Sequence, residues 1–361
     1  MSQTTFNSLP IWVIRTAATI GAIALSCNLS AQQTAVPIVS SSSSNIGATN
    51  AGTTTHFASP SYFDSVASSS ACGNGCGTTQ TCCQSTTACD DGLLGYGILK
   101  RSDHEFDRFI SPMTNPVFFE DPRNVTEARG IFFQHEVPDA AGAGDVQLYA
   151  LQLRARLSEN VSLIATKDGY VTSSNPLVND GWADLAAGLK FNLLRDVQNQ
   201  KLLSGGFTFE FPTGEASALQ GNGDGELNLF LTGGTQLGSR SHWLSAAGFR
   251  VPLNSSDESQ SVYWSNHFDY EIRRGVYFLV EGNWYHWTKS GQDGPIPGIE
   301  GLDVINLGSP GVAGNDIVTS AVGIKLKPSG NQEIGLAYEF PLTAREDILE
   351  NRVTVDWIFR F

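Results

Sequence analysis

The sequence has little positive charge and, beyond its N-terminus, no long apolar run. Only 22 Lys and Arg stand against 36 Asp and Glu, which gives a formal charge of −14. Nucleic-acid-binding surfaces are basic, so this balance argues against a nucleic-acid partner. A transmembrane helix needs about 20 consecutive apolar residues, and the chain after its N-terminus has no such stretch. The composition therefore excludes a helical membrane protein.

Helical periodicity is also missing from most of the chain. From about Glu127 onward, no 3.6-residue period persists for more than a turn, whereas Gly (37 residues) and aromatic residues (10%) are plentiful. This composition is typical of strands and turns. Period-2 alternation predicts twelve strands, most of them longer than the usual strand of about 5–6 residues. They lie at 127–137, 144–157, 160–168, 182–194, 201–211, 226–237, 241–252, 260–273, 275–288, 317–328, 331–342 and 351–361.

The last predicted strand has the clearest pattern. Val353, Val355, Trp357 and Phe359 share one face with the C-terminal Phe361, and polar residues occupy the other face. Such alternation indicates a strand with one apolar and one polar surface. A closing strand that ends on an aromatic residue resembles the assembly signal of bacterial outer-membrane β-barrels. That resemblance implies two partners, the outer-membrane lipid and the barrel assembly machinery, which would bind the strand ending at Phe361.

The connections between predicted strands alternate in length. The first, third and later odd connections are mostly long, such as 169–181 and 289–316, while the even ones are tight, such as 158–159 and 238–240. Bacterial barrels have short periplasmic turns and long outer loops, whereas a soluble carbohydrate-binding β-sandwich, the alternative fold, has no reason to keep this parity. The sequence therefore predicts an all-β, antiparallel up-and-down transmembrane β-barrel of about 12 strands over residues 127–361.

The residues before the barrel divide into three zones. Residues 1–31 resemble a secretory signal peptide, with Arg15 before a short apolar stretch and small residues at the cleavage site. Residues 32–70 are rich in Ser and Thr and read as a disordered linker. Residues 71–126 are predicted to be a largely irregular periplasmic segment. It contains Ser111-Pro112, Asn115-Pro116 and Asp121-Pro122, and the residue before a proline avoids helical conformation.

Five cysteines crowd into the start of that last zone. In an oxidising compartment, local disulfides with one thiol left over are expected. A metal site is the alternative, because closely spaced cysteines can gather ligands. No His lies within the cluster, so disulfides are preferred, and neither a metal nor another cofactor is predicted. The disulfide candidates are Cys72, Cys76, Cys82, Cys83 and Cys89.

Two short stretches resemble known exported proteins. Residues 209–214 (Phe-Glu-Phe-Pro-Thr-Gly), followed by the Gly-rich residues 221–225, are similar to outer-membrane transporters of the "MetA-pathway of phenol degradation" type. Residues 109–116 resemble exported barrel proteins of planctomycete-like bacteria. The resemblance implies a barrel in the bacterial outer membrane, with the N-terminal extension in the periplasm and small solutes as cargo.

Charged residues on the polar strand faces are expected to point into the barrel. Both signs occur, so they could line a narrow polar channel or form a salt-bridged, filled interior. His267 and Asp269 share a face with Ser265, but residues two apart on a strand are about 7 Å apart, so a hydrogen-bond network is preferred to catalysis. The lumen-lining candidates are Arg154, Arg156, Lys190, Glu210, His267, Asp269, Glu271, Arg273, Glu281 and Glu339.

The sequence thus predicts a passive channel or uptake porin for small solutes, not an enzyme. The alternative is a non-transporting envelope anchor with a filled barrel. An outer-membrane hydrolase is the third hypothesis.

Overall fold

The computed structural model describes residue 97 and residues 99–361, which form one antiparallel sheet of fourteen assigned strands. Two short 3-10 helices, η1 (Asp139–Ala141) and η2 (Ala216–Ala218), lie between strands. Within these residues, no helix is long and apolar enough to cross a membrane. The strands are β1 (Glu127–Glu136), β2 (Asp145–Arg156), β3 (Val161–Lys167), β4 (Tyr170–Ser173), β5 (Gly181–Trp182), β6 (Leu185–Asp196), β7 (Lys201–Phe211), β8 (Glu226–Gln236), β9 (Ser241–Pro252), β10 (Gln260–Arg273), β11 (Val276–Lys289), β12 (Asp316–Ser329), β13 (Gln332–Pro341) and β14 (Asn351–Arg360).

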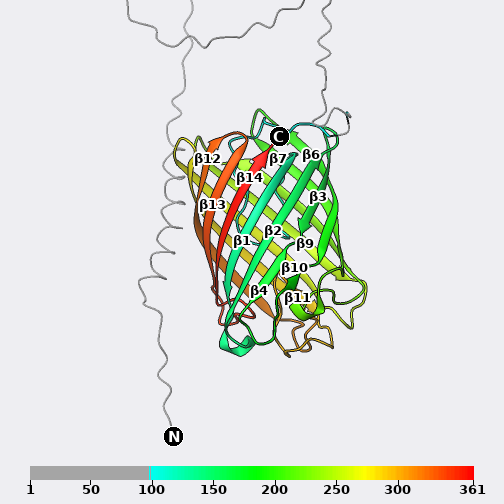
Figure 1. The fold of residues 1–361 in the computed structure, drawn as a ribbon. Helices are drawn as coiled ribbons and strands as arrows, with labels where there is room; N and C mark the ends of the chain where they lie inside the picture. The colour runs from blue at the N-terminus through cyan, green and yellow to red at the C-terminus, as the bar shows by residue number, and fades with distance from the viewer. Residues whose placement is uncertain (1–96, 98) are drawn as a thin grey trace, which may run out of the picture. The chain divides into compact units, whose positions relative to one another are not determined.

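The sheet closes on itself because β1 pairs with both β14 and β2. β3 and β4 both pair with β2 and are separated only by Asp168 and Gly169, so they make one interrupted spanning strand. β5 and β6 are related in the same way across Ala183 and Asp184. The fourteen assigned strands therefore make a closed barrel of twelve spanning strands. Figure 1 shows the barrel from the side. The predicted fold class is confirmed.

The two faces of the wall have opposite character. Leu336 and Trp357 point outward and are 54% and 51% exposed, whereas Lys190 and Arg352 point inward and are 1% exposed each. A soluble protein would bury the apolar set instead. A wall that is apolar outside and polar inside is the pattern of a barrel surrounded by lipid.

The two ends of the barrel differ in their connections. Short turns, such as the two residues between β10 and β11, lie at the end that carries the C-terminus (Figure 1). Long connections lie at the opposite end, and the longest, residues 290–315, joins β11 to β12. This is the alternation that the sequence predicted.

Candidate functional site

The interior of the barrel is occupied by chain that precedes β1. Residues 102–126, here called the luminal segment, enter and leave at the C-terminal end. The Ser102 amide donates to the Phe361 carbonyl (2.7 Å), and the Phe361 amide donates to the Thr126 carbonyl (2.9 Å). Near mid-height, the Asn115 side chain donates to Ser265 Oγ in β10 (2.9 Å). The luminal segment is therefore a hairpin-like insertion from one end.

The sequence predicted residues 71–126 to be a periplasmic segment that precedes the barrel. The part of that zone that the structure describes packs inside the barrel, because its irregular main chain finds hydrogen-bond partners on the wall. The predicted signal peptide (1–31), the linker (32–70) and the five disulfide candidates lie outside the described residues.

Side chains of the wall bind the main chain of the luminal segment. Glu281 on β11 accepts hydrogen bonds from the amides of Met113 (2.7 Å) and Thr114 (2.6 Å). Buried peptide groups must find hydrogen-bond partners. Wall side chains supply the partners that main-chain groups would supply in a helix or a sheet. Carbonyls of the segment accept from wall side chains in the pairs Lys327–Phe109, Lys325–Ser111, Arg129–Pro112, Gln152–Pro116, Thr232–Glu120, Lys190–Asp121 and Ser204–Pro122.

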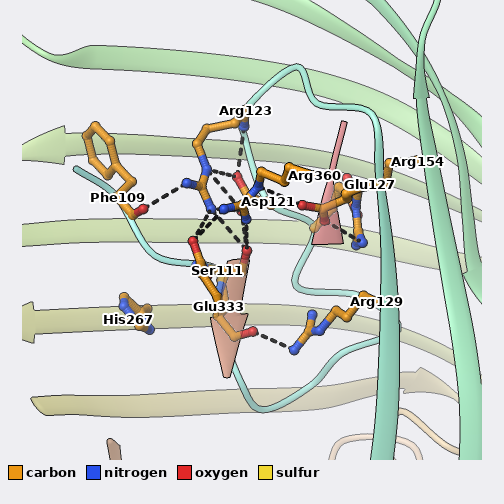
Figure 2. A network of polar contacts seen from close by, with 12 residues as sticks. Phe109, Ser111, Asp121, Arg123, Glu127, Arg129, Arg154, His267, Glu333 and Arg360 are labelled. Atoms are coloured by element: carbon orange, nitrogen blue, oxygen red, sulfur yellow. Dashed lines mark hydrogen bonds and ion pairs between the residues drawn. The ribbon is translucent and has the colours of Figure 1, made fainter. Parts of the chain in front are cut away.

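Glu333 on β13 is the centre of a buried ion-pair network between the wall and the luminal segment. It lies 2.6 Å from Arg360, 3.3 Å from Lys327 and 3.5 Å from Arg123 of the segment. Arg123 also pairs with Asp121 at 2.6 Å. Figure 2 shows Asp121, Arg123, Glu333 and Arg360 close together. All five residues are at least nine-tenths buried. Each carboxylate there has a cation within reach, so these ion pairs join the wall to the segment.

A second group of ion pairs holds the returning arm of the segment. Glu120 lies 2.6 Å from Arg154 and 2.7 Å from Lys190. Arg154 continues to Glu127 at 3.1 Å, and Glu127 to Arg360 at 2.9 Å. The two groups thus join through Arg360 into one continuous network.

Aromatic residues anchor the segment between the charged groups. The Phe118 ring stacks on Tyr263 with ring centres 5.2 Å apart, and the Arg250 guanidinium lies 4.4 Å from the Phe118 ring centre. Nearer the C-terminal end, three rings of the segment pack against small and aliphatic wall residues: Phe106, Phe109 and Phe119 against Leu202, Leu244 and Ala246. The segment therefore fills the barrel through packing as well as polar contacts.

Residues 290–315, here called the outer loop, close the other end by folding inward. Arg250 donates to the Leu302 carbonyl (2.8 Å), and Arg352 lies 2.9 Å from Asp303. Apolar side chains of the loop pack on the inside of β1 and β2, with Val304, Ile305 and Leu307 against Ile131, Phe133 and Leu148. Asp303 and Val304 of the loop and Val117 of the luminal segment line one enclosed cavity of about 20 Å³, which is roughly the space of one water. The two insertions therefore meet inside the barrel.

Buried carboxyl groups surround the seat of the outer loop. Glu300 accepts from Ser259 Oγ (2.6 Å) and from the amides of Leu307 (3.1 Å) and Ser309 (2.9 Å), while burial raises its pKa. Burial, together with the nearby Glu226 and Glu210 carboxylates, raises the pKa of Glu258 to about 8.

Asp347 lies in the neighbouring connection and belongs to the same group of acids. Burial raises the pKa of Asp347 to about 6, although Arg345 pairs with it. Its carboxylate accepts from the Glu300 amide (3.1 Å). The closed outer loop therefore packs beside three acids whose pKa values are raised by burial.

The predicted lumen-lining residues fall into two groups. Arg156 donates to the Arg101 carbonyl at the C-terminal end, Glu271 accepts from the Gly275 amide in a turn, and Arg273 is exposed at that end. The other seven point into the barrel, where they contact the luminal segment, one another or the wall: Arg154, Lys190, Glu210, His267, Asp269, Glu281 and Glu339.

His267 belongs to a chain of polar contacts. Its Nδ1 lies 2.6 Å from Glu281 and its Nε2 lies 3.2 Å from Asp269. Asp269 also contacts His242 Nδ1 at 2.7 Å. Both ring nitrogens of His267 therefore face carboxylates, and the Ser265 hydroxyl is bonded to Asn115 instead. This geometry is a hydrogen-bond network that supports the luminal segment through Glu281.

Sequence reasoning missed the residues that occupy the interior, above all Glu120, Asp121 and Arg123 of the luminal segment and Asp303 of the outer loop. One signal was present. The predicted inward faces carry more charges than a narrow interior can leave without partners, so an internal binding segment could have been inferred.

Comparisons with known proteins bear on the fold. No family model matches the chain, and no curated protein sequence is similar to it. Among solved structures, the chain is similar to the COG4313 outer membrane channel from Pseudomonas putida F1, with a TM-score of 0.51 and 13% identity over 70% of this chain and 100% of that one. It also matches the NanC porin (TM-score 0.43, 8% identity, 65% of this chain and 100% of that one) and the KdgM porin (0.38, 10%, 65% and 99%). At 13% identity, the likeness to the COG4313 channel shows a shared barrel fold.

Proposed function

We propose that this protein is a gated channel for small solutes in the bacterial outer membrane, with its N-terminal extension in the periplasm. The observation that carries the proposal is that the barrel is filled by the luminal segment, which precedes β1 and is not one of the wall strands. The polar interior of the wall is matched to a segment that is not part of the wall. A barrel whose only role is mechanical can fill its interior with its own wall side chains.

The way in which the luminal segment is held supports movement. Ser102 and Thr126 close its base, with Ser102 Oγ donating to the Thr126 carbonyl (2.9 Å). Between these residues, the chain has no sheet hydrogen bonds to the wall and is held by side chains, as with Glu281 and Lys190. Withdrawal would therefore leave the twelve-stranded ladder intact, and it would leave a lumen lined by charges of both signs.

The runner-up is a non-transporting anchor. The buried ion pairs around Glu333 favour it, because they hold the luminal segment in the barrel. On either reading, chemistry at His267 is not expected, since its ring is committed to Glu281 and Asp269. The identity of the solute, membership of the MetA-pathway type and recognition of Phe361 by the assembly machinery stay predictions.

Conductance in planar bilayers tests the proposal. Replacing residues 103–124 by a short Gly-Ser linker keeps Ser102 next to Thr126 and should give a folded barrel with larger and more frequent openings than the intact chain. Folding is checked by heat-modifiable gel mobility. A second variant also shortens the outer loop at 296–308. If the barrel that lacks both insertions folds and stays electrically silent, the anchor is the correct reading.

A cross-link distinguishes a movable plug from a fixed one. Asn115 and Ser265 have side-chain atoms 2.9 Å apart, so the N115C/S265C pair, in a background with the native cysteines replaced by serine, should lock the segment to β10. We expect the oxidised protein to be silent and reductant to restore the openings of the intact chain. The single variant N115C is the matched control and should not respond to reductant.

A further inference from the structure

Two cations of the wall hold the carboxylate of Glu120 in the luminal segment. The Arg154 guanidinium on β2 binds it as a fork, with Nε 2.9 Å from one oxygen and Nη2 2.6 Å from the other. The Lys190 ammonium on β6 lies 2.7 Å from the first of these oxygens. All three side chains are buried. A guanidinium fork matches a carboxylate in both distance and orientation, so the wall offers a fitted site for this group.

Lys190 differs from the other buried cations of the wall. Among the described residues, its hydrogen-bond acceptors all belong to the luminal segment: the Glu120 carboxylate and the carbonyls of Asp121 and Arg123. Every other buried Lys or Arg of the described wall has a wall carboxylate within ion-pair distance, as Lys167 has Glu210. Withdrawal of the segment would therefore leave Lys190 without a counter-charge, and Arg154 would lose one of its two carboxylate partners.

Hydrogen-bond donors extend this site across five adjacent strands. β8, β7, β6, β3 and β2 are neighbours in the sheet, and each directs a donor at oxygen atoms of residues 120–124. The donors are Arg154 of β2, Ser162 of β3, Lys190 of β6, Ser204 of β7 and Thr232 of β8. An anion accepts hydrogen bonds and donates none, so this part of the wall has the chemistry that an anionic group requires.

The continuous ion-pair network that contains Glu120 is short of negative charge on its wall side. Six Lys and Arg side chains of the wall belong to it, against three carboxylates, those of Glu127, Glu333 and Asp356. The luminal segment contributes Glu120, Asp121 and Arg123, which together carry one net negative charge. Withdrawal of the segment therefore removes negative charge from a region of the wall that is already positive.

We infer that Lys190 and Arg154 form a carboxylate-binding subsite of the open lumen, and that Glu120 occupies this subsite in the closed barrel in place of a solute. The inference rests on the proposed function and gives it a substrate class, small organic molecules that carry a carboxylate. Because a charge in a narrow interior is costly without a partner, a solute carboxylate replaces the one that leaves with the segment. Solute and segment compete for the same two cations, so solute binding favours the open barrel.

Chemical rescue tests the subsite in the full chain. E120A removes a fragment the size of acetate and should lower the midpoint of thermal unfolding, because two buried cations lose their shared carboxylate. Potassium acetate at constant ionic strength should raise that midpoint, whereas acetamide, which has the same shape and no charge, should not. E120A/K190Q should not respond to acetate. E120A/K167Q is the matched control, since Lys167 is a buried wall lysine that pairs with a wall carboxylate, and it should keep the response. Absence of rescue in E120A, or rescue that survives K190Q, overturns the subsite.

A second measurement examines the open lumen and does not depend on the folding of E120A. It uses the barrel in which a Gly-Ser linker replaces residues 103–124. Saturation-transfer NMR on the acetate methyl group should detect binding, which K190Q weakens roughly tenfold or more because a charge-assisted hydrogen bond is lost. K167Q should weaken it by less than about twofold. Equal binding of acetate and acetamide, or equal effects of the two variants, overturns the subsite. Binding is measured without conductance, so an electrically silent barrel that binds acetate defeats the channel alone, and a conducting barrel that does not bind it defeats the subsite alone.

Discussion

The luminal segment and the outer loop fill the two ends of the same barrel by different means. The segment is held by fully charged partners, such as Glu333 with Arg360, and by wall side chains that bind its main chain. The outer loop is held by apolar packing of Val304, Ile305 and Leu307, and it closes beside Glu258 and Glu300, whose pKa values burial raises. A charged network holds a segment in one register. Buried acids with raised pKa values, by contrast, make the hold on a loop depend on pH. We therefore expect the hold on the luminal segment to change little with pH and the hold on the outer loop to weaken as pH rises.

The largest effect is expected from removing the centre of the charged network. Glu333→Ala leaves Arg360, Lys327 and Arg123 buried without their shared carboxylate, and breaking a buried ion pair from one side costs about 3–5 kcal/mol. Reversible urea unfolding in lipid vesicles measures the loss in the free energy of unfolding. Glu159→Ala is the control, because the Glu159 side chain is 82% exposed in a turn and its loss should change stability by less than about 0.5 kcal/mol. If the two variants lower the free energy of unfolding equally, the buried network contributes no more to stability than an exposed carboxylate does.

The contrast between the two insertions also marks what the sequence could predict. Strand alternation is local, so the twelve spanning strands and the start of the barrel at Glu127 were predictable from residues next to one another. The contacts of the luminal segment are not local: Ser111 bonds to Glu333, 222 positions away. The alternation of apolar and polar residues along the chain cannot indicate a partner so distant in sequence. The prolines at 112, 116 and 122 correctly indicated an irregular chain, and irregular backbone at membrane depth must be enclosed by protein.

The outer loop was predicted only as one of the long connections. Its composition held more information, because Leu302, Val304, Ile305 and Leu307 are apolar residues in a loop that would otherwise face water. Loops at the surface are seldom so apolar, so inward folding could have been expected. The interruption between β3 and β4 at Asp168 and Gly169 was not predictable, because the predicted strand 160–168 ended there and gave no sign that the chain continues as β4.

An intermediate effect is expected from pH acting on the outer loop. The pKa of Glu258 rises from an ordinary 4.5 to about 8 in the closed loop, so the closed form is favoured below pH 4.5 and loses that advantage as pH rises through 8. Asp347 shifts from 3.8 to about 6 and contributes the same sign at lower pH. Between pH 6 and 9, amide protection factors of residues 296–308 should therefore fall, while those of the luminal segment stay constant.

Glu258→Gln is the variant that isolates this effect. Its neutral amide resembles the protonated acid, so loop protection should stay high and nearly flat from pH 6 to 9. Glu159→Gln, a carboxylate at the opposite end, should keep the pH dependence of the intact chain. If protection of the luminal segment falls in parallel with that of the loop, then the two insertions open together and the assignment of pH sensitivity to the loop alone is wrong.

The smallest effect is expected at the base of the luminal segment, and it tests whether firmness comes from burial. Arg195 binds Asp103 through two hydrogen bonds of 2.8 and 3.0 Å, the same kind of charge pair as that inside the barrel, but its side chain is 36% exposed. Only the Arg195 side of the pair reaches solvent, because the Asp103 side chain is 6% exposed. The pair should therefore contribute more than the roughly 0–1 kcal/mol of an exposed pair and less than the roughly 3–5 kcal/mol lost when a buried pair is broken. We expect Arg195→Gln to lower the free energy of unfolding by about 1–2 kcal/mol, and added salt should reduce the difference because solvent screens the Arg195 side of the pair. Suppose instead that Arg195→Gln lowers the free energy of unfolding as much as Glu333→Ala does. The luminal segment would then be held mainly by the Arg195–Asp103 pair at its base, and the buried network would form only when that pair is in place.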